Sequence, residues 1–397
     1  MAVIPPEQEY IIVLIYSALH DVPPAFPPER MEWEKLYRLS ALHGVSNLVF
    51  YGLKQLHQDA QVPGQVMKKF LNDWKKALAR EAAQHLAMEA MRLCFEENAV
   101  ANLPLKGCLL KYLYPRPDMR FMADIDILVR KEQTGQVKEL MQALGFIAVD
   151  QGGNHDIYHR KPFLNVEIHR RLISETSPYY TYLEKVWDRA VLQPGYRYTY
   201  RLSREDSYIY IFLHLTKHYM RGGTGIRSFL DLWVYLRRYE KEMDMAYIGA
   251  ELELVGLRKF EQNIRGFSKA CFENGQSNWQ SDELYRKMAA YVFSSGTYGT
   301  QKFSTLSSLC GEVNGTRMPP KLTYLMRLFF PPVKHLINTY PFLSGRPWLL
   351  PACWILRGGK CLLFKQRYMV HIIGHVRLVS RKNIENLEHL HKKTGIP

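Results

Sequence analysis

Apolar and polar positions follow two different periods along the chain, and the change of period divides it into parts. Residues 7–98 and 205–300 place apolar side chains three or four positions apart, which is typical of amphipathic helices. Residues 99–172 instead form short segments rich in β-branched side chains and bounded by glycine and proline. The pattern predicts an α+β protein, in which a small mixed sheet with its own helices lies within mainly helical flanking regions.

The central segment predicts strand, helix, strand and helix, followed by an antiparallel meander. Gly145 is placed to end the second of these helices. The expected strands cover residues 99–107, 124–130, 146–151, 155–160 and 164–172.

A stretch rich in Gly, Ser and Thr, residues 294–316, is the expected linker. The other expected parts are an N-terminal helical region (1–98), the α/β core (99–175), a helical domain (176–293) and a basic, aromatic C-terminal region (317–397).

Charge is concentrated at the C-terminal end of the chain. The net charge of the whole chain is +15, and residues 317–397 hold 14 Lys and Arg against two acids, a net +12. We therefore expect an acidic partner there, either anionic lipid or nucleic acid, since basic residues mixed with Trp, Phe and Tyr suit both. A packed helical subdomain with a basic exterior is the plainer alternative.

No apolar run reaches the roughly 18 residues that a membrane-spanning helix requires. The first ten residues lack the basic and apolar segments of a signal peptide. The six cysteines contain no CxxC pair, so we expect free thiols in a reducing cytoplasm. The expected location is the cytoplasm, with peripheral membrane contact as an extension of it.

Two carboxylates stand together in the apolar segment "FMADIDILVR" (121–130). On a strand, Asp124 and Asp126 point to the same face, while Ile125 and Ile127 point to the other. Adjacent carboxylates repel each other, and a divalent cation removes that repulsion. Two acids at a strand end that simply face water are the alternative.

Glu167, in "NVEIH", is also flanked by apolar residues. If its strand neighbours the one carrying Asp126, Glu167 completes a three-carboxylate cluster able to hold two metal ions. His169 shares the face of Glu167, where it either orients an acceptor or caps the sheet.

Basic residues precede the carboxylates. Lys106 and Gly107 end the first expected strand, where glycine permits a close approach of backbone to phosphate. Arg120 lies four residues before Asp124 and, like Lys106, is a candidate to bind a triphosphate, although a solvated surface role suits either residue.

A second polar cluster follows in "HLTKHYMRGGTGIRSFLDL". His214 and His218 share a helix face, and Arg227 and Asp231 have the spacing of an intrahelical pair. These residues either line the catalytic cleft, contacting acceptor or nucleotide, or form a buried polar network between two helices. Zinc binding by the two histidines is a weaker alternative.

The combination of these motifs resembles a known family. The segments "LPLKGCLLKYLYPRPDMRFMADIDILV", "LGF", "NVEIH" and "HLTKH…GIRSFLDL" are similar to the bacterial uncharacterised nucleotidyltransferases, within the polymerase-β-like nucleotidyltransferase superfamily. The resemblance covers about residues 30–260. It implies that Asp124, Asp126 and Glu167 bind the metal. The superfamily's usual Gly-Ser or Gly-Gly is replaced here by Lys106-Gly107-Cys108.

The resemblance implies an enzyme that moves a nucleoside monophosphate from an NTP, such as ATP, to a hydroxyl and releases pyrophosphate. Mg²⁺ is the expected ion, with Mn²⁺ as an alternative. The acceptor is left open among protein, small molecule, sugar and RNA. The alternative function is a catalytically degenerate nucleotide-binding or scaffold protein, associated with membrane or RNA through its basic C-terminal region.

Overall fold

The computed structural model describes residues 5–396 except 58, 174–176, 178, 275–277, 298, 314–319, 338–339, 365–373, 375 and 377–378. The expected boundary at residue 175, the end of the expected linker (314–316) and tail residues 365–373 lie outside the described residues. Within the described part, no helix combines the length and the apolar character needed to cross a bilayer.

The described helices are α1 (Pro6–His20), α2 (Trp33–Leu42), α3 (Ser46–Leu53), α4 (Gly64–Glu97), α5 (Gly107–Leu110), α6 (Thr134–Ala143), α7 (Tyr180–Glu184), α8 (Val186–Arg189), α9 (Arg204–Arg221), α10 (Ile226–Tyr239), α11 (Met245–Leu254), α12 (Arg258–Phe272), α13 (Glu283–Ser295), α14 (Gln301–Val313), α15 (Pro320–Phe329), α16 (Val333–Leu336), α17 (Leu350–Phe364) and α19 (Arg381–Thr394). The described strands are β1 (Asn102–Pro104), β2 (Ile125–Val129), β3 (Ile147–Asp150), β4 (His155–Arg160), β5 (Leu164–His169), β6 (Val191–Leu192) and β7 (Tyr200–Arg201).

A five-stranded mixed sheet forms the centre of the α/β part, in the order β1-β2-β5-β4-β3. The β2 and β5 strands are parallel, and the other neighbours are antiparallel. The expected antiparallel meander is confirmed as β3, β4 and β5. Because the connection from β2 to β5 passes through α6 and the β3–β4 hairpin, residues 41 positions apart become neighbours in the sheet.

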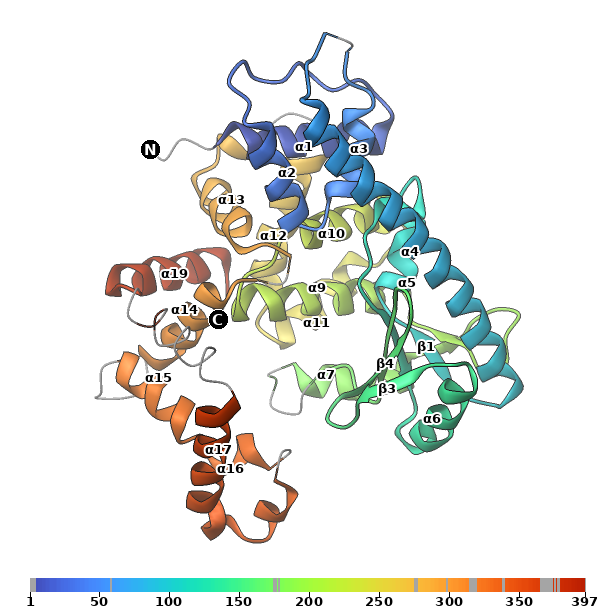
Figure 1. The fold of residues 1–397 in the computed structure, drawn as a ribbon, viewed down its shortest axis with the longest axis vertical. Coiled ribbons are helices and arrows are strands. Elements are labelled where there is room, and N and C mark those ends of the chain that lie inside the picture. Colours follow the sequence, from blue (N-terminus) through green and yellow to red (C-terminus); the bar gives the residue numbers. More distant parts are fainter. Residues whose placement is uncertain are drawn as a thin grey trace.

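The two faces of the sheet have different partners. On one face, Ile125, Ile127 and Val129 of β2 pack with side chains of α4 and α6 in one hydrophobic core. On the other face, Leu128 joins a larger core that includes residues of α1, α3, α9, α10 and α12. The α/β unit is therefore covered by helices on both sides (Figure 1). Asp126 of β2 and Glu167 of β5 line one cavity together with residues of α9.

The long helix α4 connects the two cores. Its first half contributes Phe70 to the large helical core, and its second half contributes Met91 and Phe95 to the core beneath the sheet. Figure 1 shows α4 running from the N-terminal helices down to the sheet. Both helical regions that flank the sheet in sequence share the large core, so they support the α/β unit jointly.

The C-terminal region divides into two structural parts. Residues of α19, including Leu387 and Leu390, pack into the large core, whereas α16, α17 and the turns between them enclose a small separate core around Leu336, Leu343 and Cys353.

Helix α14 lies within residues 294–316, where we expected a linker, and α14 packs against α19. The expected division into five regions remains a prediction.

Candidate active site

Three carboxylates converge at the ends of β2 and β5. Asp124 immediately precedes β2, Asp126 lies within it, and Glu167 is the direct partner of Asp126 in the parallel pairing. Oxygen atoms of the three side chains all lie within 4.8 Å of one another. Asp126 is buried and the other two are half-buried, so one side of the cluster remains accessible.

The pKa values of the three carboxylates are shifted in different directions, because burial, mutual repulsion and neighbouring cations act on them unequally. Burial raises the pKa of Asp124, and the charge of Asp126 raises it further. Burial likewise raises the pKa of Glu167, with added repulsion from Asp126 and Asp124. Burial also opposes the ionisation of Asp126, but Lys106 and His169 outweigh it and hold its pKa well below the usual range. The cluster therefore holds one firmly ionised carboxylate, Asp126, beside two whose ionised form a bound cation would stabilise.

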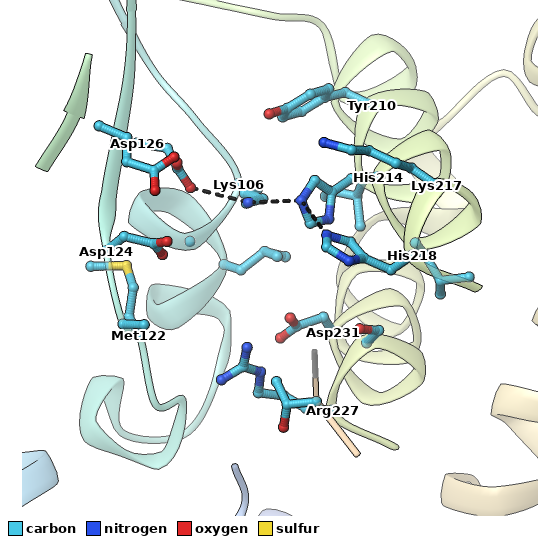
Figure 2. A pocket seen from close by; sticks show the side chains of 18 of the residues that line it. Lys106, Met122, Asp124, Asp126, Tyr210, His214, Lys217, His218, Arg227 and Asp231 are labelled. Atoms are coloured by element: carbon cyan, nitrogen blue, oxygen red, sulfur yellow. Dashed lines mark hydrogen bonds and ion pairs between the residues drawn. The ribbon is translucent and has the colours of Figure 1, made fainter. Parts of the chain in front are cut away.

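Both oxygens of Asp126 have partners. Lys106 Nζ lies 3.1 Å from Oδ2, and His169 Nε2 lies 2.9 Å from Oδ1. Lys106 Nζ also lies 3.0 Å from His214 Nε2, so it connects the carboxylates to α9 (Figure 2). The structure thus brings Lys106 and His169 to the carboxylates, whereas the sequence had suggested Lys106 as a ligand of the triphosphate and His169 as a neighbour of Glu167.

Helix α9 places a polar face opposite the carboxylates. Tyr210, His214, Lys217 and His218 all line the same cavity, because their spacing returns each of them to one side of the helix. His214 and His218 are in contact, with 3.3 Å between their Nε2 atoms. Burial lowers the pKa of both histidines, to about 4 for His218, and nearby Lys106 and Lys217 lower it further.

Arg120 is held by a buried ion pair. Its Nε and Nη2 atoms each donate to a carboxylate oxygen of Asp231 at 2.8 Å, and Tyr114 donates to Oδ1 of the same carboxylate at 2.8 Å. Arg120 and Asp231 therefore join the segment before β2 to α10. The polar network that the sequence offered as an alternative lay between two helices and did not include Arg120. Both Arg120 and Asp231 border the cavity.

Arg227 lines the cavity next to Asp231 on α10 (Figure 2). Its Nη1 atom donates to the carbonyl oxygen of Phe121 at 3.0 Å. Arg227 thereby fixes the backbone that leads into Asp124.

Gly107 lies where a side chain has no room. A Cβ atom at this position would stand 2.8 Å from Met122 Sδ and 3.1 Å from Arg120 Nη1. Glycine here permits close packing beneath the cavity, and the helix that follows, α5, has four residues.

These side chains enclose one cavity of about 400 Å³, with Asp124, Asp126 and Glu167 on the sheet side and Lys217 and Arg227 on the helical side. Figure 2 shows the two walls facing each other across the opening. Such a cavity can hold a polyphosphate between cations and a metal ion between carboxylates.

His155 and Tyr210 are among the residues of this cavity that the predictions from sequence did not include. His155, on β4, lies opposite His169 in the hairpin register, and the three-residue turn after Arg160 was a signal that could have revealed it. Tyr210 lies one helical turn before His214 and was treated only as part of an apolar helix. Lys217, which belongs to the second polar cluster of the sequence, also lines the cavity.

Comparison with known proteins supplies the family. Residues 29–273 match the family described as uncharacterised nucleotidyltransferases. The chain belongs to this family. One similar solved structure is the solution structure of the antibiotic-resistance factor ANT(2'')-Ia, with 10% identity over 46% of this chain and 92% of that chain and a TM-score of 0.33. A search of curated proteins finds no match.

The carboxylate cluster of this nucleotidyltransferase has the composition of a divalent-metal site. Its donor atoms are all oxygens, which is the donor type that Mg²⁺ prefers. The half-buried Asp124 and Glu167 leave an accessible side toward the cavity. The residues therefore fit Mg²⁺, and Asp124, Asp126 and Glu167 would hold it.

Proposed function

We propose that this nucleotidyltransferase moves a nucleoside monophosphate from an NTP to a hydroxyl acceptor and releases pyrophosphate, with Mg²⁺ held by Asp124, Asp126 and Glu167. The observation that carries the proposal is the pairing of those carboxylates with a basic wall across one cavity. We place the reaction in the cytoplasm, as expected for a chain whose six cysteines are unpaired.

In the proposed reaction, the acceptor hydroxyl attacks the α-phosphorus while the bond to the pyrophosphate oxygen breaks. Bound Mg²⁺ would offset the charge of the phosphates and lower the pKa of the attacking hydroxyl. Glu167, with its raised pKa, is the candidate to accept the hydroxyl proton. Lys106, Lys217 and Arg227 offset the negative charge of the triphosphate.

Each further residue of the cavity has a supporting role in this proposal. His214 holds Lys106 from the side of α9, and His169 holds Asp126 from the side of β5. Arg120 acts through Asp231 by fixing the segment that carries Asp124. In-line phosphoryl transfer depends mainly on positioning and electrostatics, so these contacts suffice for the chemistry.

A labelling experiment tests the proposal. The full-length protein is incubated with each α-³²P-labelled NTP and Mg²⁺ or Mn²⁺, with and without cell lysate as a source of acceptors. We expect transfer of label that falls about 100-fold or more in Asp124→Asn and Glu167→Gln. Asp150→Asn, an exposed carboxylate on the same sheet, is the matched control.

The outcomes also decide the alternative function. If no NTP labels any acceptor while the wild type and Asp124→Asn bind nucleotide equally, the protein is a non-catalytic nucleotide-binding scaffold. Transfer that survives in both carboxylate variants would instead place the chemistry elsewhere in the chain.

We also propose that the small C-terminal subdomain, residues 320–364, contacts an anionic membrane surface. Large apolar side chains are exposed on it, with Trp348 at 73% and Ile355 at 76%. Six basic residues and no acids lie within residues 320–364. Exposed aromatic and aliphatic groups beside positive charge suit the interface of an anionic bilayer.

Vesicle cosedimentation tests this second proposal. Phosphatidylserine-containing vesicles should bind the wild type, and Trp348→Ser with Ile355→Ser should weaken binding by about tenfold. Leu254→Ser changes an equally exposed side chain on α11 and should have no effect. Equal binding by the double variant, or binding to RNA alone, would reject membrane contact. Truncation at residue 317 is unsuitable because α19 packs into the large core.

A further inference from the structure

A second group of metal-binding side chains lies on the β4–β5 hairpin. In the antiparallel register His155 is opposite His169, and Glu167 is on the same strand as His169 two residues away. These three side chains therefore share one face of the sheet. Their ligand atoms all lie within 4.8 Å of one another.

Two of the three ligand distances within this group are close to the edge length of a metal-ligand polyhedron. Glu167 Oε2 lies 3.7 Å from His155 Nε2 and 3.5 Å from His169 Nε2. Ligands about 2.0–2.1 Å from a tetrahedral Zn²⁺ are separated by about 3.3 Å. To bind an ion, the side chains therefore need to shorten each of these two distances by only a few tenths of an ångström.

The chemistry of the group differs from that of the carboxylate cluster. Two imidazoles and one carboxylate suit Zn²⁺ and related first-row transition metals, whereas three carboxylates suit Mg²⁺. We propose that His155, Glu167 and His169 form a transition-metal site of the Zn²⁺ class next to the proposed transfer site, with which it shares Glu167. His155 is 35% exposed, which gives an ion access from solvent.

His169 links the two groups. Its Nε2 atom lies 2.9 Å from Asp126 Oδ1 and 3.5 Å from Glu167 Oε2. That nitrogen has one lone pair or one proton, so it either donates to Asp126 or binds a metal. Metal binding at the histidine group therefore releases one oxygen of Asp126, which becomes available to a cation in the carboxylate cluster.

Co²⁺ is the probe that tests the site, because its visible d–d absorption reports low-coordinate binding by imidazole. The full-length protein is freed of metal with a chelator and titrated with Co²⁺, first without and then with excess Mg²⁺. We expect one equivalent to bind with an intense d–d band, and His155→Ala to weaken that binding about 100-fold. His155→Gln, which retains a polar side chain, should lose the band as well and guards against an effect of folding.

Two control variants separate this site from the carboxylate cluster. His159→Ala removes an exposed imidazole from the same strand and should leave the band unchanged. Asp124→Asn should abolish nucleotidyl transfer and retain the band. If the band persists in both His155 variants, or if Asp124→Asn or excess Mg²⁺ removes it, the proposed transition-metal site is wrong, whatever the result of the labelling experiment.

Discussion

Lys106 Nζ lies 3.1 Å from Asp126 Oδ2, so an ammonium group occupies one side of the carboxylate that we propose as a metal ligand. The same nitrogen reaches His214 on α9. Lys106 therefore offers Asp126 a positive charge before any cation binds, and it competes with a metal for the same oxygen.

Replacement of Lys106 should have opposite effects on metal binding and on catalysis. Lys106→Met removes the competing charge, so we expect Mn²⁺ to bind the nucleotide-free protein about tenfold more tightly. Nucleotidyl transfer should fall by about 100-fold because the triphosphate loses a cation. Electron paramagnetic resonance titration of free Mn²⁺ measures the first effect. Lys138→Met, an exposed lysine of α6, is the control, and weaker Mn²⁺ binding in Lys106→Met would contradict the interpretation.

Much of the α/β unit could be predicted because its signals are local. The alternation in residues 124–130 placed Asp124 and Asp126 on one face, and the meander of three strands followed from its turns. The adjacency of Glu167 to Asp126 was a condition that sequence alone could not test, since it depends on β5 inserting beside β2. The structure meets that condition.

The rest of the site depends on contacts between distant segments. Asp231 has the spacing to pair with Arg227, yet its carboxylate accepts two hydrogen bonds from Arg120, 111 residues earlier in the chain. Helix α19 lies in a basic tail by composition but packs into the large core. No local pattern encodes such pairings, because they arise only when separate elements meet.

A side chain at Gly107 should destabilise the protein. In Gly107→Ala the added Cβ would meet Met122 and Arg120, and the strain should lower the free energy of unfolding by about 1–3 kcal/mol. Urea denaturation measures this change. Gly135→Ala is the matched control, because nothing lies within 4 Å of a Cβ there and α6 should be unchanged or slightly stabilised. Equal stability of the two variants would show that the contacts at Gly107 relax freely.

His43 should make the protein less stable in mild acid. Burial lowers the pKa of His43 to about 4, against the opposing hydrogen bond to the carbonyl of Phe293. Since its unfolded pKa is about 6.5, the unfolded chain takes up a proton first as the pH falls from 6.5 toward 4. His43 thus contributes stability above pH 6.5 that is progressively lost below it, by roughly 2 kcal/mol at pH 5.

Urea denaturation of wild type and His43→Gln at pH 7 and pH 5 isolates this effect from that of the other buried histidines. The stability advantage of the wild type over His43→Gln should shrink by roughly 2 kcal/mol between the two values. The same comparison with His159→Gln, an exposed histidine, should show no change. A constant difference between wild type and His43→Gln would mean that His43 titrates normally in the folded protein.

The ion pair of Arg120 and Asp231 should contribute to stability as a unit. Asp231→Ala leaves the buried guanidinium without its partner, so we expect a loss of about 3–5 kcal/mol in the free energy of unfolding. Arg120→Met combined with Asp231→Leu removes both charges and should recover much of that loss. Glu139→Ala, an exposed carboxylate of α6, should change stability by less than about 0.5 kcal/mol.

The KM for the NTP distinguishes a positioning role of Arg120 from direct binding of the triphosphate. It should stay within about twofold in the folded double variant if Arg120 only positions the segment before Asp124. A large rise in KM without a loss of stability would instead mean that Arg120 binds the triphosphate directly.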